Sequence, residues 1–103
     1  MPIKHLIVDH RVIDGDTIEA TLDLGFGLQY ITPVRLIGVS APERNTPEGK
    51  VSKKKLEEFM QADRLVCQSS AKRGSFGRVL GRIYADGVDL NQRLIDEHYA
   101  SVY

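Results

Sequence analysis

The sequence predicts an α+β, β-rich fold in which a five-stranded Greek-key barrel carries two to three helices. Short segments with alternating apolar and polar residues recur between turn signals, which is typical of half-buried strands. Two segments show helical spacing of apolar residues, one between strands and one after the last strand. At 103 residues, the chain is expected to form one domain spanning 1–103.

The first two expected strands, Leu6–Arg11 and Thr17–Leu24, flank a tight turn at Asp14–Asp16. From Thr17 onward apolar and polar side chains alternate cleanly, and Asp16 is in phase with the apolar positions. A carboxylate aimed at the core is costly unless it is paired or bound to a metal. The pattern therefore marks Asp16 as a candidate site residue.

The chain is organised around Val34–Glu43 (V-R-L-I-G-V-S-A-P-E), which we expect to be a strand ending in a turn. Both of its faces carry apolar residues, which favours a central strand. Because Ala41 precedes a proline, its backbone is restricted to extended conformations, and the strand cannot continue as a helix. Arg35 and Glu43 are then fixed on either side of one strand end.

The remaining elements follow from local signals. Thr46 is expected to cap a helix that begins at Pro47, and a second helix is expected from Asp89 to about His98, where a left-handed residue would fit. The other expected strands are Leu28–Ile31, which Thr32-Pro33 should kink, Arg64–Ser69 and Arg78–Tyr84. The expected apolar stripe of the first helix is Val51, Leu56, Phe59 and Met60.

Composition narrows the class of protein. The chain has 14 basic and 14 acidic side chains, so nucleic-acid binding would depend on a local patch rather than on net charge. The single cysteine, Cys67, excludes an internal disulfide, fits a reducing compartment and is expected to be buried in a strand. No membrane partner and no secretion signal are expected, which favours a cytoplasmic location and leaves a secreted mature form open.

Charged residues of three kinds recur in short motifs. Arg35 and Arg78 can hold phosphate oxygens through bidentate hydrogen bonds. Asp14, Asp16 and Glu43 supply carboxylates that can bind a hard cation or accept a proton. Together they suggest a metal-assisted phosphodiester site.

Four motifs appear in order: D-G-D-T, V-R-L-I-G-V-S-A-P-E, F-G-R-V-L-G-R-I-Y-A-D-G and L-N-Q-R-L-I. In this order and spacing, from about Ile13 to Tyr103, the chain resembles the staphylococcal (thermonuclease) nuclease family. The resemblance implies an OB-fold barrel, one Ca²⁺ ion and hydrolysis of DNA and RNA.

The resemblance also assigns roles to single residues. Asp16 would bind calcium directly, Ala41 would bind it through its backbone carbonyl, and Asp14 would support Asp16. Ser40 stands where the family usually has a metal-binding Asp, and it offers only a hydroxyl group or a water molecule. Because calcium affinity follows ligand charge, we expect this difference to weaken binding at least tenfold.

On the substrate side, Arg35 and Arg78 would contact the phosphate, and Glu43 would act as general base. Phe76, Tyr103 and, in the basic turn before F-G-R, Lys72 would contact the substrate, which is expected to be single-stranded or breathing DNA or RNA of any sequence.

Alternatives to this interpretation stay open. One is a non-catalytic nucleic-acid- or protein-binding module that keeps the barrel and has lost its metal through Ser40, and another is a pure interaction domain. Asp14 and Asp16 are also common turn formers, and Lys50–Lys55 is more simply a solvated helix face than a phosphate-binding surface. The sequence leaves the oligomeric state open.

Overall fold

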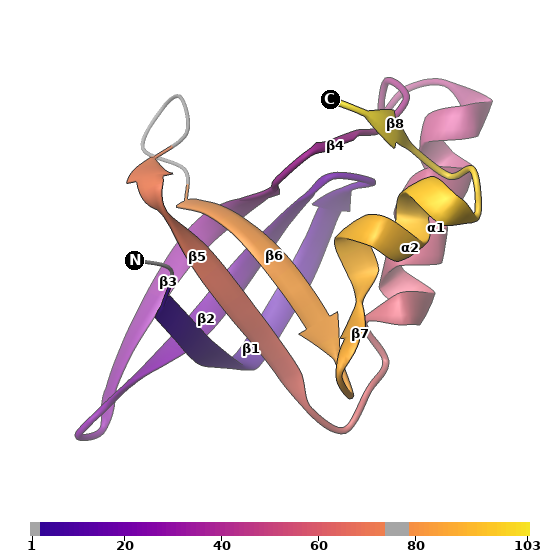
Figure 1. Ribbon diagram of the computed structural model, residues 1–103. Helices are drawn as coiled ribbons and strands as arrows, with labels where there is room; N and C mark the ends of the chain where they lie inside the picture. The colour runs from indigo at the N-terminus through magenta and orange to yellow at the C-terminus, as the bar shows by residue number, and fades with distance from the viewer. Residues whose placement is uncertain (1–2, 74–78) are drawn as a thin grey trace.

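The computed structural model describes residues 3–73 and 79–103 (Figure 1). The strands are β1 (Ile3–Asp14), β2 (Thr17–Gly25), β3 (Leu28–Leu36), β4 (Val39–Ser40), β5 (Leu65–Arg73), β6 (Val79–Ala85), β7 (Val88–Asp89) and β8 (Ser101–Val102). The helices are α1 (Pro47–Phe59) and α2 (Leu90–Asp96). Neither helix has the length and apolar character needed to cross a membrane.

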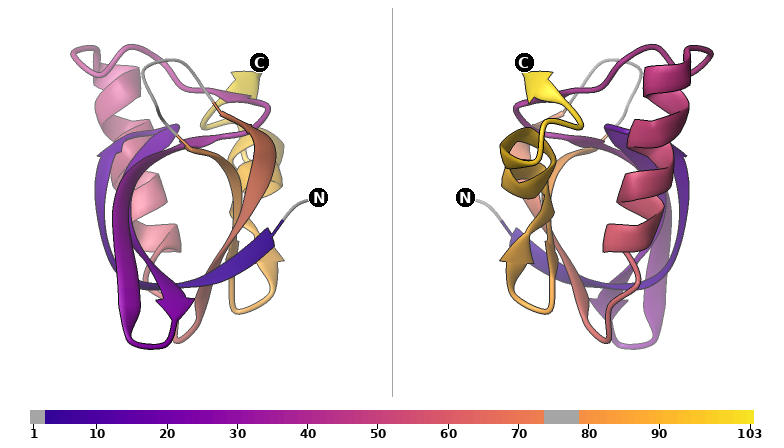
Figure 2. Two further views of the ribbon diagram at one scale, coloured as in Figure 1. Left: turned by 90° about the vertical axis from the view of Figure 1, so that its left-hand side faces the viewer. Right: turned by 90° about the vertical axis from the view of Figure 1, so that its right-hand side faces the viewer.

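The main sheet closes into a barrel. Its strand order is β3-β2-β1-β5-β6-β7, and a parallel pairing of β3 with β6, in which Arg35 lies opposite Leu80, joins the two sides. Figure 2 shows the strands curving into a ring, with α1 and α2 both at one end of the barrel, in front of the ring in the right-hand view. The prediction of an α+β, OB-fold-like barrel of five strands is therefore confirmed, with two helices in the described residues.

The barrel interior is formed by the alternating residues of each strand. Ile18 and Ala20 are fully buried and Leu22 nearly so, as their alternation predicts. Leu24 has the same phase but is 44% exposed, because the β2–β3 hairpin extends past the barrel (Figure 1). Cys67 is fully buried as expected, and burial raises the pKa of its thiol to about 11.

The stretch expected to be one strand from Val34 onward is divided in two. β3 ends at Leu36, and a turn follows in which Gly38 adopts a positive φ of 73°. The chain resumes as β4, which pairs with β8 instead of the barrel. The expected kink at Thr32-Pro33 does not interrupt β3, since its register with β2 is unbroken there.

Helix α1 begins as predicted, but its buried face differs by one position. The Thr46 hydroxyl accepts a hydrogen bond from the Gly49 N–H at 3.0 Å, which is the expected cap. Val51 is 54% exposed, so its assignment to the core was wrong. Ser52 is buried instead, because it shares a helix face with Leu56 and Phe59 at spacings of four and three residues.

The end of α2 confirms the expectation of a left-handed residue at His98. Its φ is +64°, and the N–H of Tyr99 returns to the Leu94 carbonyl at 2.9 Å. This is the pattern in which a left-handed residue closes a helix and satisfies its last carbonyl groups.

Changing His98 to glycine is expected to raise the free energy of unfolding by about 0.5–1 kcal/mol, because glycine adopts positive φ without a Cβ clash. Urea unfolding followed by circular dichroism measures the change. His98→Ala is the matched control: it keeps the Cβ atom and is expected to bring no gain. A glycine variant that is less stable than the wild type would contradict this account.

Candidate functional site

The carboxylate of Asp16 lies at the end of the barrel where β1 turns into β2. Its Oδ2 accepts a hydrogen bond from the Ala41 N–H at 2.9 Å and lies 3.5 Å from Nη2 of Arg35. Its Oδ1 accepts the hydroxyl hydrogen of Thr17 at 2.9 Å. The side chains of Asp16 and Arg35 are each only 16% exposed. The inward carboxylate that the alternation predicts is therefore present and paired.

Asp14 and Asp16 have opposite electrostatic tendencies. Burial, followed by its hydrogen bond with Asp16, raises the pKa of Asp14. Burial alone would also raise the pKa of Asp16, but hydrogen bonds with Asp14 and the Ala41 amide favour its ionised form. The Thr17 hydroxyl and the charge of Arg35 act in the same direction, so the pKa of Asp16 is lowered overall. Asp16 is thus the better anionic ligand of the two.

Arg35 is held in one orientation by backbone carbonyl groups. Its Nη1 donates to the carbonyls of Leu36 at 2.9 Å and Val39 at 2.6 Å, across the turn that separates β3 from β4. The ring of Tyr103 lies 5.1 Å from the guanidinium carbon, and the Tyr103 N–H donates to the Gly38 carbonyl at 3.0 Å. Its Nη2 forms the 3.5 Å ion pair with Asp16, so a carboxylate as well as the two carbonyls orients the guanidinium.

The backbone of Glu43 is fixed to the start of α1. Its carbonyl accepts hydrogen bonds from the Thr46 N–H at 3.0 Å and from the Thr46 hydroxyl at 2.7 Å. A Cβ atom on Gly49 would lie 1.8 Å from that same carbonyl oxygen, so only glycine permits this approach. The Glu43 side chain is exposed to solvent, where it can meet a substrate.

Asp14, Asp16 and Glu43 are among the residues that line one hollow of about 290 Å³. It is lined by Asp14, Asp16, Ala41, Pro42, Glu43 and Arg44. Arg44 was not predicted from the sequence as a residue of this site, although its position directly after Glu43 could have indicated it. Ser40 lines a separate hollow of about 410 Å³ together with Ala41, Pro42 and residues 98–101. Ala41 and Pro42 thus form the boundary between Ser40 and the carboxylates.

Three residues expected at the site are not placed. Arg78 and Phe76 lie outside the described residues. Lys72 belongs to β5, whose described side chains end at Ser70.

Comparison with known proteins identifies the family of this chain. Residues 33–103 match the family model described as staphylococcal nuclease homologue. The chain belongs to this nuclease family. It is 33% identical over 94 residues to an uncharacterized endonuclease of Escherichia coli, covering 90% of this chain and 58% of that protein. It is 27% identical over 100 residues to the SPbeta prophage-derived endonuclease YokF of Bacillus subtilis, covering 89% of this chain and 32% of that protein.

The predicted family membership is therefore confirmed. The chain spans little more than half the length of the Escherichia coli relative. Both of these relatives are named as endonucleases.

Residues without an assigned role in the sequence turn out to support the site. Asn91 is buried; its side-chain amide donates to the Ile37 carbonyl at 2.9 Å and to the Gly81 carbonyl at 3.1 Å, and its oxygen accepts the Ile83 N–H at 3.0 Å. It thereby ties the turn after Arg35 to β6. Its only signal in the sequence was a polar residue between the leucines of L-N-Q-R-L-I.

Helix α1 packs directly against the Asp14–Asp16 turn. A Cβ atom on Gly15 would lie 2.0 Å from Oγ of Ser52, which is itself buried and without a hydrogen-bond partner among the described residues. The glycine in D-G-D-T therefore serves close packing as well as turn formation. This close packing lies between the two aspartates in the sequence, at the centre of the turn.

The available donors fit calcium in type. Carboxylates from Asp14, Asp16 and Glu43 and the carbonyl of Ala41 are hard oxygen ligands of the kind that calcium binds. Within residues 3–73 and 79–103, no three or more His, Cys, Asp or Glu side chains come close enough to form a ready-made metal site. Water and substrate phosphate would have to complete the coordination of a bound ion.

Proposed function

We propose that this chain is a calcium-dependent nuclease that hydrolyses phosphodiester bonds of DNA and RNA with little sequence specificity. The observation that carries the proposal is the Asp16–Arg35 pair, with 3.5 Å between Oδ2 and Nη2, beside the hollow that Glu43 also lines. A fixed guanidinium, an ionised carboxylate and an exposed carboxylate then share one end of the barrel. The endonuclease names of the relatives support the reaction class.

Asp16 would hold the cation, with the Ala41 carbonyl, Asp14 and a hydroxyl or water at Ser40 as further oxygen donors. A bound calcium ion would supply positive charge beside the phosphate and orient the attacking water. Asp16 is suited to this role because its neighbours keep it ionised. Its hydrogen bond from Ala41 fixes the direction of its Oδ2.

Arg35 would bind two phosphate oxygens through its remaining donors, and Arg78 would serve as a second phosphate-binding arginine. These contacts strengthen as negative charge builds up in the transition state, so they accelerate the reaction as well as bind the substrate. Glu43 would take the proton of the attacking water as the new oxygen–phosphorus bond forms and the ester bond breaks, and the leaving oxygen would take a proton from solvent water.

Substrate recognition would avoid the edges of the bases. Tyr103 is 85% exposed beside Arg35, which suits stacking on an unpaired base, and we assign Phe76 the same role and Lys72 a phosphate contact. Stacking and phosphate contacts do not distinguish sequences, so single-stranded or breathing DNA and RNA would both be substrates.

The second candidate function is a non-catalytic module that binds nucleic acid or protein. The position of Ser40 favours it, because Ser40 lines a different hollow from Asp14 and Asp16. A site without a second charged ligand at this position would hold calcium poorly or not at all.

Thermal melting with calcium separates these candidates. Millimolar calcium is expected to raise the melting temperature, because an ion bound only by the folded state stabilises it. Ser40→Asp should tighten binding about tenfold, adding ~1.4 kcal/mol at saturation and several degrees to the shift. Asp16→Asn should abolish the shift, and Asp9→Asn, on the exposed part of β1, is the control that should keep it. No shift in the wild type, with or without a nucleotide, would favour the binding module.

A further inference from the structure

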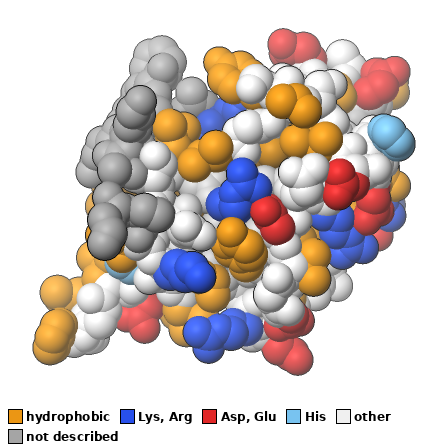
Figure 3. Space-filling view, viewed as in Figure 1, with side chains coloured by type: hydrophobic (Ala, Val, Ile, Leu, Met, Phe, Trp, Pro, Cys, Tyr) orange, Lys and Arg blue, Asp and Glu red, His pale blue; other side chains and the backbone are white. Residues whose placement is uncertain are grey.

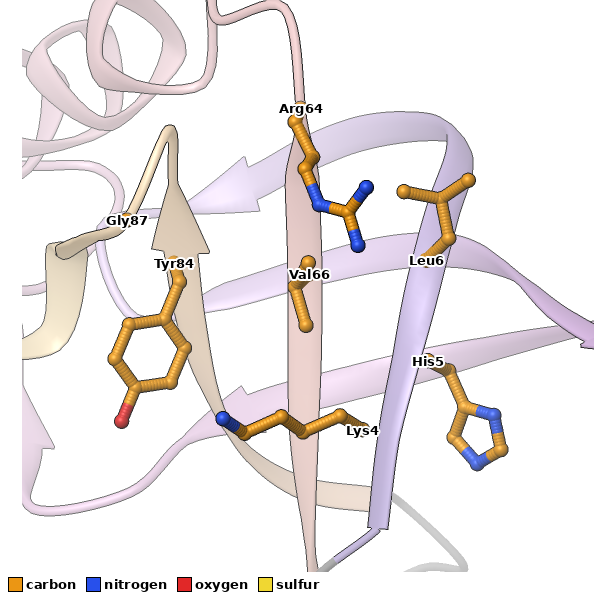
Figure 4. A pocket seen from close by; sticks show the side chains of 7 residues that line it. All are labelled: Lys4, His5, Leu6, Arg64, Val66, Tyr84 and Gly87. Carbon is orange, nitrogen blue, oxygen red and sulfur yellow. The ribbon is translucent and has the colours of Figure 1, made fainter.

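A second surface lies on the outside of strands β1, β5 and β6. In the sheet register Leu6 lies opposite Val66, and Val66 lies opposite Tyr84. The neighbouring positions Leu65 and Ala85 are buried, so strand alternation turns Val66 and Tyr84 outward. Figure 4 shows these three side chains as an apolar and aromatic row across the three strands.

Cationic side chains flank this row. Lys4 extends across β5 so that its Nζ lies 5.8 Å from the centre of the Tyr84 ring, and the Arg64 guanidinium reaches toward Leu6 (Figure 4). Both cations are exposed, and neither forms an ion pair with any side chain that the structure describes. Arg82 lies at the edge of the row but is neutralised by Asp89 at 2.7 Å.

These side chains form a shallow hollow of about 420 Å³, which His5 and Gly87 complete. Figure 3 shows Lys and Arg side chains beside apolar ones on this face of the molecule, with Asp or Glu side chains among them. We define the β1–β5–β6 patch as Lys4, Leu6, Arg64, Val66 and Tyr84. It lies outside the hollow of Asp16 and Glu43, with which it shares no residue.

We infer that the β1–β5–β6 patch binds single-stranded nucleic acid as a second anchoring site for the substrate of the proposed nuclease, on whose function this inference rests. Lys4 and Arg64 can attract the anionic phosphates of a nucleic-acid strand, and the ring of Tyr84 can stack on one of its bases. The net charge of the chain is zero, so attraction of a polyanion depends on such a local group. A second copy of this face would bring like charges together, which disfavours a symmetric dimer here.

The distance along the barrel fits one continuous strand. Leu80 of β6 lies opposite Arg35, and Tyr84 is four residues further along β6. At about 3.3 Å per residue, this separates the two positions by ~13 Å. A stacked strand advances about 3.4 Å per phosphate, so roughly four nucleotides would bridge them. That length lies within the range of about 4–16 nucleotides that OB folds bind.

Fluorescence anisotropy of labelled oligothymidylates tests this inference. The Glu43→Gln background and chelator prevent cleavage, and trinucleotides are compared with oligomers of about 12 nucleotides. The Lys4→Glu/Arg64→Glu double variant should bind the long oligomer at least about tenfold more weakly, with the salt slope reduced by about 1.4 at ~0.7 per phosphate contact. Trinucleotide binding should stay unchanged.

Two further variants guard against trivial explanations. Lys54 is an exposed lysine of α1, outside the patch. The Lys54→Glu variant makes the same charge change as one of the two patch substitutions and should have little effect on the binding of long oligomers. Tyr84→Leu keeps the apolar packing, removes the ring, and should weaken binding of the long oligomer about fivefold or more. Circular dichroism melting establishes that each variant is folded before its binding is compared.

Equal weakening of short and long oligomers, or an equal loss in Lys54→Glu, would overturn the inference. The inference would also be overturned if the patch variants bound the long oligomer as tightly as the unsubstituted patch does, whether or not they changed self-association. If calcium-dependent cleavage is absent from the wild type while the length-dependent effect persists, the proposed nuclease function fails and the binding surface stands. If the wild type cleaves and the patch variants bind normally, only the surface fails.

Discussion

Replacing Glu43 with glutamine is expected to lower the rate of DNA cleavage by about 10²- to 10⁴-fold, because an amide cannot accept the proton of the attacking water. The fold should be unaffected, since Thr46 donates two hydrogen bonds to the Glu43 carbonyl, Gly49 leaves room for that carbonyl, and the Glu43 side chain is exposed. Initial rates on a single-stranded oligonucleotide in millimolar calcium, together with melting curves, measure both effects.

Glu48→Gln is the matched control for this change. Glu48 is another exposed glutamate, in the first turn of α1, and it does not line the carboxylate hollow. Its replacement should leave the rate within about twofold of the wild type. A Glu43→Gln variant that cleaves as fast as the wild type would remove Glu43 from the mechanism.

Replacing Arg35 with lysine should lower the cleavage rate by about 10²- to 10³-fold, because a lysine lacks the planar fork that binds two phosphate oxygens. It should also lower the free energy of unfolding by about 1–3 kcal/mol. The single nitrogen of lysine cannot occupy both the Nη1 position beside the Leu36 and Val39 carbonyls and the Nη2 position beside Asp16. Cleavage assays and urea unfolding of the same preparation separate the two effects.

Arg11→Lys provides the comparison for Arg35→Lys. Arg11 is a largely exposed strand arginine with only a 3.6 Å ion pair to Glu19, so its replacement should change neither rate nor stability measurably. If Arg35→Lys loses stability but cleaves at the wild-type rate, then Arg35 acts only as a structural residue.

Local signals in the sequence were enough to predict most of the elements of this fold. The alternation around Ile18 identified a half-buried strand, and Thr46 and His98 marked helix ends through backbone chemistry that involves only near neighbours. Val51 failed for a physical reason: it is more apolar than Ser52, yet the small residue is needed where α1 meets Gly15. That packing is set by a turn far away in the sequence.

In the site, too, the sequence predicted features that depend on neighbouring residues and did not predict contacts between residues far apart in the chain. The phase of the strand predicted that Asp16 points inward, but its contacts with Arg35 and the Ala41 amide span 19 and 25 residues. The role of Asn91 depends on a carbonyl 54 residues away. Apolar residues continue past Leu36, so the apolar pattern alone did not predict that β3 ends there. The strand ends because the chain turns at Gly38.

The central claim is tested most directly by cleavage of plasmid and single-stranded DNA in millimolar calcium against chelator, with wild type, Glu43→Gln and Ser40→Asp side by side. The wild type is expected to cleave only with calcium, Glu43→Gln to be inactive, and Ser40→Asp to cleave at lower calcium concentrations. Cleavage by Ser40→Asp alone would contradict the nuclease function of the natural chain and favour the binding module. Inactivity of all three proteins would show that this barrel has a function other than phosphodiester hydrolysis.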